Sequence, residues 1–471
     1  MKTYIALLVL LTLTGCTVGP NYQRPEVATP SAYKEARDWK AAEPQDQAPR
    51  GNWWEIYGDM ELNSLVAQVA LSNQNVLAAA AQYRQSLASL GVAQAVYLPT
   101  LNANASASRA KGTSASPTEG TTVISGAPIR NTTRLSLSAS WEADIWGRIG
   151  RNVESNQATA QASDADLHAA LLSAQATLVQ NYFQLRANDA QQRLLQQTIT
   201  AYARSLEITK NRYEAGVAGR VDVAQAAAQL QSTQAQDIDL RIQRAQFEHA
   251  IAVLIGKAPA DFALKATDKL PTLPLLPAAL PATLLERRPD IAGAERRMAA
   301  ANAQIGVAQA AFFPALTFSG TGGYQGSSLS HLLTLPNRFW SIGPALALSL
   351  FDGGARTAQK ESAVASYDKN VATYRQTVLS AFQEVEDNIA ALHHLQDEAA
   401  AQQSATQFAA ESLALTENQY QAGTVSYLNV VIAQATALSA QRSSLDIAAR
   451  RLLSNAVLIK ALGGDWRVGT K

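Results

Sequence analysis

The chain has 471 residues, a formal net charge of +1 and a charged fraction of 16%, below the roughly 25% of typical soluble domains. This balance argues against a nucleic-acid-binding protein, which needs a basic face. The length allows two or three domains, and beyond the N-terminus no stretch reaches the roughly 18 consecutive apolar residues of a membrane-spanning helix.

Residues 1–15 have the features of a secretory signal peptide, with Lys2 before an apolar run and a small residue at its end. The single cysteine ends the tetrapeptide Leu13-Thr-Gly-Cys16, which resembles a bacterial lipobox. We expect cleavage before Cys16 and a covalent lipid such as palmitate on this residue. The alternative, an ordinary signal peptide, leaves a free thiol. By resemblance to lipoprotein sorting, Thr17 favours the outer membrane.

Residues 16–60 read as a lipidated, proline-rich N-terminal tether, and Trp53-Trp54 begins the first pattern that can pack. The following apolar residues are spaced for one face of a helix: Leu62, Leu65, Val66 and Val69. This spacing predicts a helix that continues past Asn75 to about Val96.

Alternating apolar and polar residues predict two β-hairpins. The first spans about 100–144, with strands at 101–107 and 135–141 and a Gly/Ser/Thr-rich loop at about 110–130. The second spans about 314–351, where Leu316 and Phe318 begin one strand and Leu346, Leu348 and Leu350 mark the other. The strand lengths suit transmembrane β-strands of about 9–11 residues. A half-exposed soluble hairpin would show the same alternation.

Two long runs contain no Gly or Pro, over residues 151–215 and 355–422. The second has an apolar heptad seam over five heptads, which predicts a supercoiled helix roughly 100 Å long. Each run ends at a glycine, Gly216 or Gly423, and a second helix-compatible run follows. We expect antiparallel helical hairpins at about 150–255 and 355–462.

The chain contains an internal repeat. Gly91-Val-Ala-Gln-Ala95 recurs as Gly306-Val-Ala-Gln-Ala310, and Tyr213-Glu-Ala-Gly216 recurs as Tyr420-Gln-Ala-Gly423. We expect a first repeat over 61–256, a proline-rich linker over 257–288, a second repeat over 289–464 and a C-terminal tail over 465–471. The spacing between matched residues indicates that the first hairpin loop is about eight residues longer.

Closure of a membrane sheet constrains the assembly. Four strands are too few for a membrane barrel, whose minimum is about eight, and open sheet edges do not occur in lipid. Three copies would supply twelve strands and twelve helices around a duct. The predicted fold class is an α+β membrane protein. It has a long antiparallel α-helical barrel and a transmembrane β-barrel with four strands per chain, twelve in a homotrimer, and two internal structural repeats.

Several motifs occur in a characteristic order along nearly the whole mature chain: Val18-Gly-Pro-Asn-Tyr-Gln-Arg-Pro25, Trp53-Trp54, Arg287-Arg-Pro-Asp-Ile291, Phe313-Pro314, Phe351-Asp-Gly-Gly354 and Gly423-Thr-Val-Ser-Tyr-Leu-Asn-Val430. With these motifs the chain resembles the outer-membrane factor (TolC-like) family, in its lipoprotein (NodT-type) efflux branch. The resemblance implies a passive outer-membrane channel that exports small molecules such as drugs and contributes to antibiotic resistance. It also implies a homotrimer, contact with outer-membrane lipid, a periplasmic membrane-fusion adaptor and an inner-membrane pump, for which we expect the RND type.

The resemblance also implies site residues. In the family, the two helical turns form a periplasmic tip that contacts the adaptor and narrows the pore. The candidates are Tyr213, Gly216, Asp222, Tyr420, Gly423, Tyr427, Leu428 and Asn429. Three copies of Asp222 could form a cation-favouring ring, or Asp222 could be a solvated residue at a helix start. Ile432 and Ala435 occupy positions where some members carry a charged latch, so we expect closure by packing around Tyr427 and Leu428.

The sequence shows no nucleophile, metal-ligand or phosphate-loop motif, so we expect neither enzyme activity, a metal nor a cofactor besides the lipid on Cys16. Two alternatives stay open. One is a protein-export duct of the type I secretion kind, and the lipobox and the motif at residues 18–25 favour efflux over it. The other is a lipid-anchored periplasmic coiled-coil scaffold without a pore, which has no use for the alternating segments.

Overall fold

The computed structural model describes residues 17–24, 51–118, 121–267, 269–274 and 288–464. The expected signal peptide, Cys16 and the tail at 465–471 lie outside these residues. The chain divides into two compact units. The first comprises Met1–Pro25, Arg84–Gln161 and Glu295–Thr373, and the second comprises Glu26–Tyr83, Ala162–Ala294 and Tyr374–Lys471. None of the helices in the described ranges has a stretch long and apolar enough to cross a membrane.

The region after the tether forms a short 3-10 helix and two α-helices: η1 (Trp53–Tyr57), α2 (Met60–Ser72) and α3 (Gln74–Ala95). The predicted apolar face of α2 is buried. The prediction of one continuous helix is wrong, because the helix breaks at Asn73. The Asn73 side chain accepts hydrogen bonds from the amides of Asn75 and Val76, and Asn is among the preferred residues at a helix N-cap.

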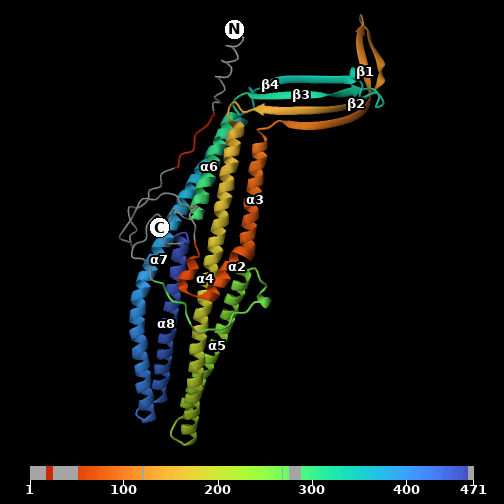
Figure 1. Cartoon of the computed structure of the whole chain (residues 1–471). Helices are drawn as coiled ribbons and strands as arrows, with labels where there is room; N and C mark the ends of the chain where they lie inside the picture. Colours follow the sequence, from red (N-terminus) through yellow and green to blue (C-terminus); the bar gives the residue numbers. More distant parts are fainter. Residues whose placement is uncertain (1–16, 25–50, 119–120, 268, 275–287, 465–471) are drawn as a thin grey trace. The chain divides into compact units, whose positions relative to one another are not determined.

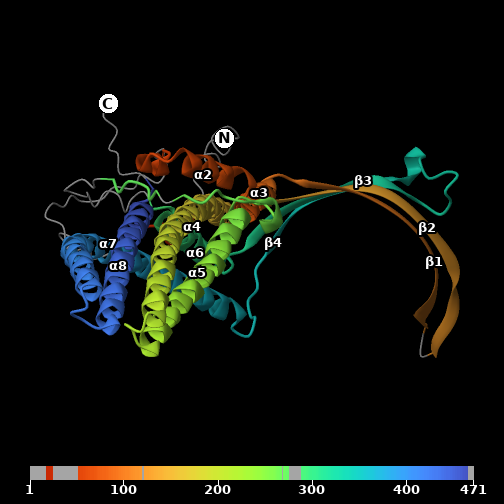
Figure 2. The same ribbon diagram turned by 90° about the horizontal axis from the view of Figure 1, so that it is seen from below.

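The four predicted strands are present as one antiparallel sheet in the order β1-β2-β3-β4. Their bounds are β1 (Thr100–Thr118), β2 (Thr121–Ala143), β3 (Ala315–Gly326) and β4 (Arg338–Ala347). Figure 2 shows that the sheet curves along its strands. The predicted loop at 110–130 is wrong, since pairing continues to Thr118 and Thr121 with one register shift after Lys111. A β-ladder pairs backbone groups, so a Gly/Ser/Thr-rich stretch can extend it without apolar side chains.

Two further details of the hairpins differ from expectation. Strand β4 ends at Ala347, so Leu348 and Leu350 lie beyond it. The extra length of the first hairpin also lies in its strands, of 19 and 23 residues against 12 and 10 in the second. In the second hairpin, the connection holds the 3-10 turn η4 (Leu335–Asn337).

The long helices are α4 (Arg148–Glu214), α5 (Arg220–Leu254), α6 (Pro289–Ala310), α7 (Ala355–Gln421) and α8 (Tyr427–Ala461). Both α4 and α7 have 67 residues, and both α5 and α8 have 35. Figure 1 shows α5 returning along α4 and α8 along α7, so the two predicted antiparallel pairs are confirmed. The heptad seam of α7 is buried around Val378 and Val385, whereas Val364 is exposed. The described residues of its own chain cover this part of the seam only partly.

The second unit has an apolar core where η1 and α2 pack on the middle of α4 and the ends of α5 and α8. A buried arginine of this unit lies immediately before α6. Arg288 pairs with Asp290 and Glu384 and donates to the carbonyl of Ala461. Pro289 begins α6, and proline suits the first position of a helix. The Arg-Pro-Asp motif therefore ties α6 to α7 and to the end of α8.

In the first unit, residues 17–24 lie against the start of α4 and against α6. The amide of Val18 donates to the carbonyl of Trp146, and Arg151 donates to Asn21 Oδ1 at 2.7 Å. Gly19 has φ +106°, and a Cβ there would lie 2.5 Å from Gly306 Cα. The beginning of the expected tether is therefore an ordered part of this unit.

Candidate functional site

The four strands present one apolar face. Residues paired across an antiparallel sheet point to the same side, so the register aligns them in rows. One row is Leu101, Ala139, Gly320 and Ile342, and the next is Ala103, Leu137, Gly322 and Trp340. Trp340 is 72% exposed and Ile342 79%. Large apolar side chains left uncovered in this way mark a membrane or protein contact surface.

The opposite face is polar. Its rows include Asn102, Ser138, Thr321 and Ser341, and Asn104 donates to Ser138 Oγ on the same side. Aromatic residues on the apolar face lie at two levels: Trp141 stacks on Phe318, and Tyr324 and Trp340 lie farther along the strands. Phe318 and Tyr324 are about 20 Å apart along β3, which suits the two aromatic girdles that flank the apolar band of outer-membrane strands.

Both helical hairpins reverse through the same turn. Gly216 and Gly423 have φ +75° and +76°, a conformation that glycine adopts without strain. In each turn the glycine amide donates to the carbonyl of the tyrosine three residues earlier, Tyr213 or Tyr420. These bonds satisfy helix carbonyls that would otherwise lack a partner.

The two turns also contact each other through an arginine that the sequence analysis missed. Arg212, at the end of α4, donates to the carbonyl of Tyr420 at 3.2 Å and lies over its ring at 4.6 Å. The Tyr420 ring meets Tyr427 edge-on. The residue before Tyr420 in the second run is Gln419. The available signal was therefore a charge before the first turn that has no counterpart before the second.

Tyr427 is the buried centre of this cluster. It packs with Ala226 and Val430, and its hydroxyl lies 3.0 Å from Ser205 Oγ. Burial raises the pKa of the Tyr427 hydroxyl, so this group stays neutral at physiological pH. Tyr427 is thus packed within its own chain, and closure of the pore around Tyr427 and Leu428 stays a prediction.

The other candidates occupy different surroundings. Tyr213, Leu428 and Asn429 are exposed. Asp222 Oδ2 accepts the amide of Gly219 at 3.1 Å, so Asp222 caps the start of α5, where the helix dipole favours an anion. This contact accounts for Asp222 as a helix-start residue, and its place in a ring stays a prediction.

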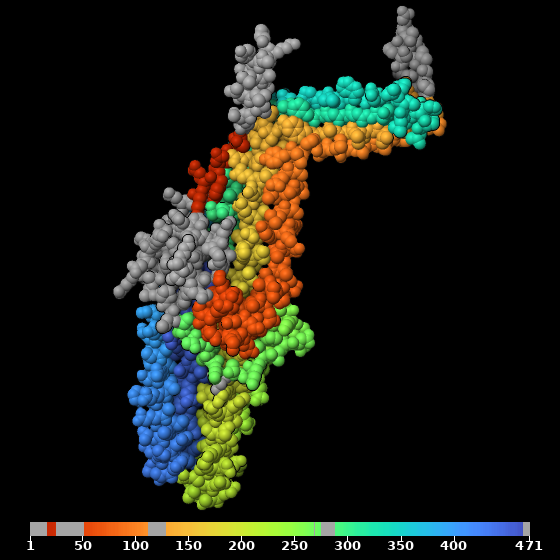
Figure 3. All heavy atoms as spheres, viewed as in Figure 1, coloured from red at the N-terminus to blue at the C-terminus, as the bar shows by residue number. Residues whose placement is uncertain are grey.

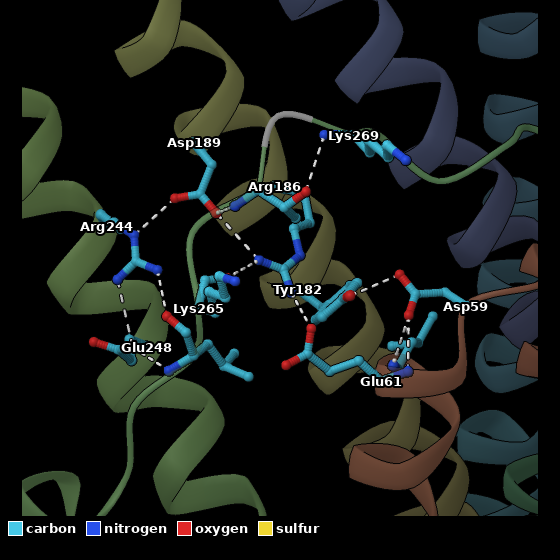
Figure 4. Close-up of polar contacts among 12 residues, drawn as sticks. Asp59, Glu61, Tyr182, Arg186, Asp189, Arg244, Glu248, Lys265 and Lys269 are labelled. Atoms are coloured by element: carbon cyan, nitrogen blue, oxygen red, sulfur yellow. Dashed lines mark hydrogen bonds and ion pairs between the residues drawn. The ribbon is translucent and has the colours of Figure 1, made fainter.

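A cluster of charged residues lies in the second unit, around the segment that follows α5 and the 3-10 turn η2 (Pro259–Asp261). We call residues 262–267 the strap, and Figure 3 shows this green segment on the surface next to α2. Figure 4 shows Asp189 between two arginines, Arg186 and Arg244, at 3.1 and 2.7 Å. Arg186 also pairs with Glu61.

Backbone groups of the strap bond to this cluster. The carbonyl of Leu264 accepts from Arg244, and that of Lys265 accepts from Arg186. The amide of Leu264 donates to Glu248, and that of Thr267 donates to Asp189. The cluster therefore fixes the linker to α4 and α5. Among the described residues, no group of three or more His, Cys, Asp or Glu side chains is placed to hold a metal ion.

The outer membrane efflux protein family matches residues 65–257 and 280–464. The chain belongs to this family. The pyoverdine export outer membrane protein OpmQ of Pseudomonas aeruginosa is 31% identical over 469 residues, covering 99% of this chain and 98% of OpmQ. The probable efflux pump outer membrane protein TtgC of Pseudomonas putida is 29% identical over 456 residues, covering 96% of this chain and 93% of TtgC.

Solved structures agree with this assignment. The outer-membrane channel OprN superposes with a TM-score of 0.86 at 30% identity, covering 96% of this chain and 100% of that one. CusC superposes with a TM-score of 0.82 at 26% identity, with coverage of 96% and 100%. The chain is therefore an efflux channel protein of the outer membrane, as its motifs indicated.

Proposed function

We propose that three copies of this efflux protein form one duct, with a shared twelve-stranded barrel in the outer membrane and a helical barrel in the periplasm. The observation that carries the proposal is the open sheet. Strands β1 and β4 end the strand order without a further partner in the described part of the chain. Neighbouring copies would satisfy these edges, because lipid offers no hydrogen bonds to an unpaired strand.

The two sheet faces support the same arrangement, with the apolar face toward lipid and the polar face toward the lumen. The partly covered seam of α7 around Val364 would supply a surface for a neighbouring copy. The matched lengths of α4 with α7 and of α5 with α8 support two internal repeats. A lipid on Cys16 would add an anchor next to the bound segment 17–24.

The duct would act with a periplasmic adaptor and an inner-membrane pump of the RND type, and would pass small molecules passively. The names of two relatives support export: CusC of Escherichia coli is a cation efflux system protein and OpmQ is a pyoverdine export outer membrane protein. The adaptor would contact the turns at Gly216 and Gly423, where Tyr213, Leu428 and Asn429 are exposed. The Arg212–Tyr420 contact would hold the turns together and narrow the pore.

The first test is the native mass of the protein extracted from outer membranes in mild detergent. A species near three times the chain mass is expected. A monomer that shows no heat-modified gel migration, and that behaves in carbonate extraction as a peripheral or simply anchored protein, would refute the duct and favour the scaffold.

The second test is the conductance of Arg212→Ala in planar bilayers. Loss of the bond to the Tyr420 carbonyl should raise the conductance above that of the native protein. Lys210→Ala, an exposed residue on the same helix, removes the same charge and should leave conductance unchanged. Equal conductance in all three proteins would contradict the proposed role of this contact.

Export of a folded or unfolded polypeptide instead of small molecules would favour the protein-export duct.

A further inference from the structure

The apolar face of the sheet has a hollow that the efflux function does not explain. It has a volume of about 730 Å³ and is lined by Ala103, Leu135, Leu137, Gly322, Tyr324 and Trp340, among others. The hollow exists because Ala103 and Gly322 are small while their neighbours in the same and adjacent rows are large. Its size falls within the range of small-molecule sites, about 300–1,000 Å³.

Three basic residues on the apolar face form what we call its basic margin, at the edge of the hollow and beyond it along the strands. Arg338 lines the hollow and is in the row of Ala105, Leu135 and Tyr324. Arg109 and Lys111 follow at alternate positions of β1 on the same side, and all three cations are exposed. The single acidic residue of the four strands, Glu142, belongs to the polar face.

The cations lie away from the strand ends that adjoin the helices. Strand β1 begins five residues after α3 ends at Ala95, and β4 ends shortly before α7 begins. Arg338 is the first residue of β4, at its end remote from the helices, and Arg109 and Lys111 lie midway along β1, farther from the helices than the row of Arg338. With the helices in the periplasm, this margin lies at the level of the outer leaflet. In the proposed barrel the β4 edge meets the β1 edge of a neighbouring copy.

We propose that the hollow and its basic margin bind lipid A, the phosphorylated glycolipid of the outer leaflet. One acyl chain lies along Ala103 and Gly322 against Trp340, and a phosphate accepts hydrogen bonds from Arg338. Arginine suits this role because its planar fork binds phosphate in a bidentate way. This inference rests on the proposed function, since it needs a membrane-embedded trimer.

The test measures lipid bound to the purified trimer by native mass spectrometry. Delipidated protein is titrated with lipid A, with dephosphorylated lipid A and with phosphatidylethanolamine. The native protein should prefer lipid A. Arg338→Gln should weaken binding about tenfold, as expected for loss of one charged hydrogen bond. Arg130→Gln is the matched control, because Arg130 pairs with Ala110 on the polar face.

A second variant tests the hollow without changing charge. Gly322→Leu should fill it and weaken binding, and a Cβ at Gly322 has no neighbour closer than 3.9 Å. Gly343→Leu, on the polar face and with nothing within 4 Å of its Cβ, should bind lipid A as the native protein does.

Equal lipid A binding by Arg338→Gln and Arg130→Gln would overturn the proposal, as would equal affinity for lipid A and its dephosphorylated form. These outcomes in a trimer that reaches the outer membrane refute the lipid site alone. A protein that is monomeric or absent from that membrane refutes the proposed function itself.

Discussion

Replacing Asp189 by alanine should release the strap while leaving the long helices formed. The Asp189 side chain is 1% exposed and accepts hydrogen bonds from Arg186, Arg244 and the amide of Thr267. Removing one partner of a buried ion pair costs about 3–5 kcal/mol. We expect about 3 kcal/mol here, because Arg186 keeps Glu61 and the Lys265 carbonyl as partners.

A loss of about 3 kcal/mol raises the population of the locally opened strap about 100-fold. Limited trypsin digestion, with cleavage after Lys265 followed by mass spectrometry, measures this population when opening is fast relative to cleavage. Asp189→Ala should therefore be cut about 100-fold faster at this bond. Asp189→Asn retains the shape of the side chain and some of its hydrogen bonds, so its cleavage rate should lie between those of the native protein and Asp189→Ala.

The control for this experiment is Glu398→Ala. Glu398 forms an ion pair with Arg450 on the protein surface, and such pairs contribute less than about 1 kcal/mol. Its cleavage after Lys265 should match the native rate. If Asp189→Ala is cut no faster than this control, the ion pairs do not hold the strap and the reasoning fails.

Three further changes have defined outcomes. Gly323→Ala should disrupt the sheet, because the new Cβ would lie 2.1 Å from a carbonyl oxygen of β2. The variant should then lose the difference in gel migration between unheated and heated protein that a folded sheet gives. Gly322→Ala, whose Cβ would have no neighbour closer than 3.9 Å, should keep this difference. Gly19→Ala should speed hydrogen exchange at the Val18 amide, since its backbone has φ +106° and its Cβ would meet the α6 backbone. Burial raises the pKa of the Tyr57 hydroxyl, so Tyr57 should contribute a loss of stability of about 1.4 kcal/mol per pH unit above about pH 10. Burial also raises the pKa of the Tyr182 hydroxyl, so the slope measured by thermal unfolding should be smaller in Tyr57→Phe than in the native protein.

Each of these predictions has an outcome that contradicts it. Normal migration of Gly323→Ala would mean that β2 and β3 tolerate a shift at this point. For Gly19, the control is Gly91→Ala, whose Cβ has open space, and equal exchange in both variants would contradict the close approach. For Tyr57, an unchanged slope in the Phe variant would assign the alkaline loss of stability to other groups.

The repeating features of the fold were predictable from the sequence. The heptads and the missing Gly and Pro located α4 and α7, and the alternation around Leu101 and Leu135 located the first hairpin. The length of β1 and β2 was not predictable, because their outer parts are Gly/Ser/Thr-rich and their pairing uses backbone groups that leave no apolar pattern. The break at Asn73 did have a signal, an N-cap residue followed by a helical run.

Some residues of the candidate sites were likewise predictable from the sequence, and others were not. Gly216 and Gly423 were predictable because each ends a long run and must turn the chain. Arg212 contacts Tyr420 across 208 positions of sequence, and no local pattern encodes such a contact. Arg186–Asp189 and Arg244–Glu248 have helical spacing, but that spacing also occurs in solvated pairs, so it gave no indication of a buried cluster beneath the strap.

The open edges of the sheet have a consequence for cells that make native and altered copies together. In the proposed trimer every copy must offer both β1 and β4 to its neighbours, so one copy with a blocked edge leaves the whole ring unclosed. A variant with a proline at a hydrogen-bonding position of β4 would therefore be dominant, inactivating channels that also contain native copies. A cell making both forms would lose more channels than the share of altered chains alone.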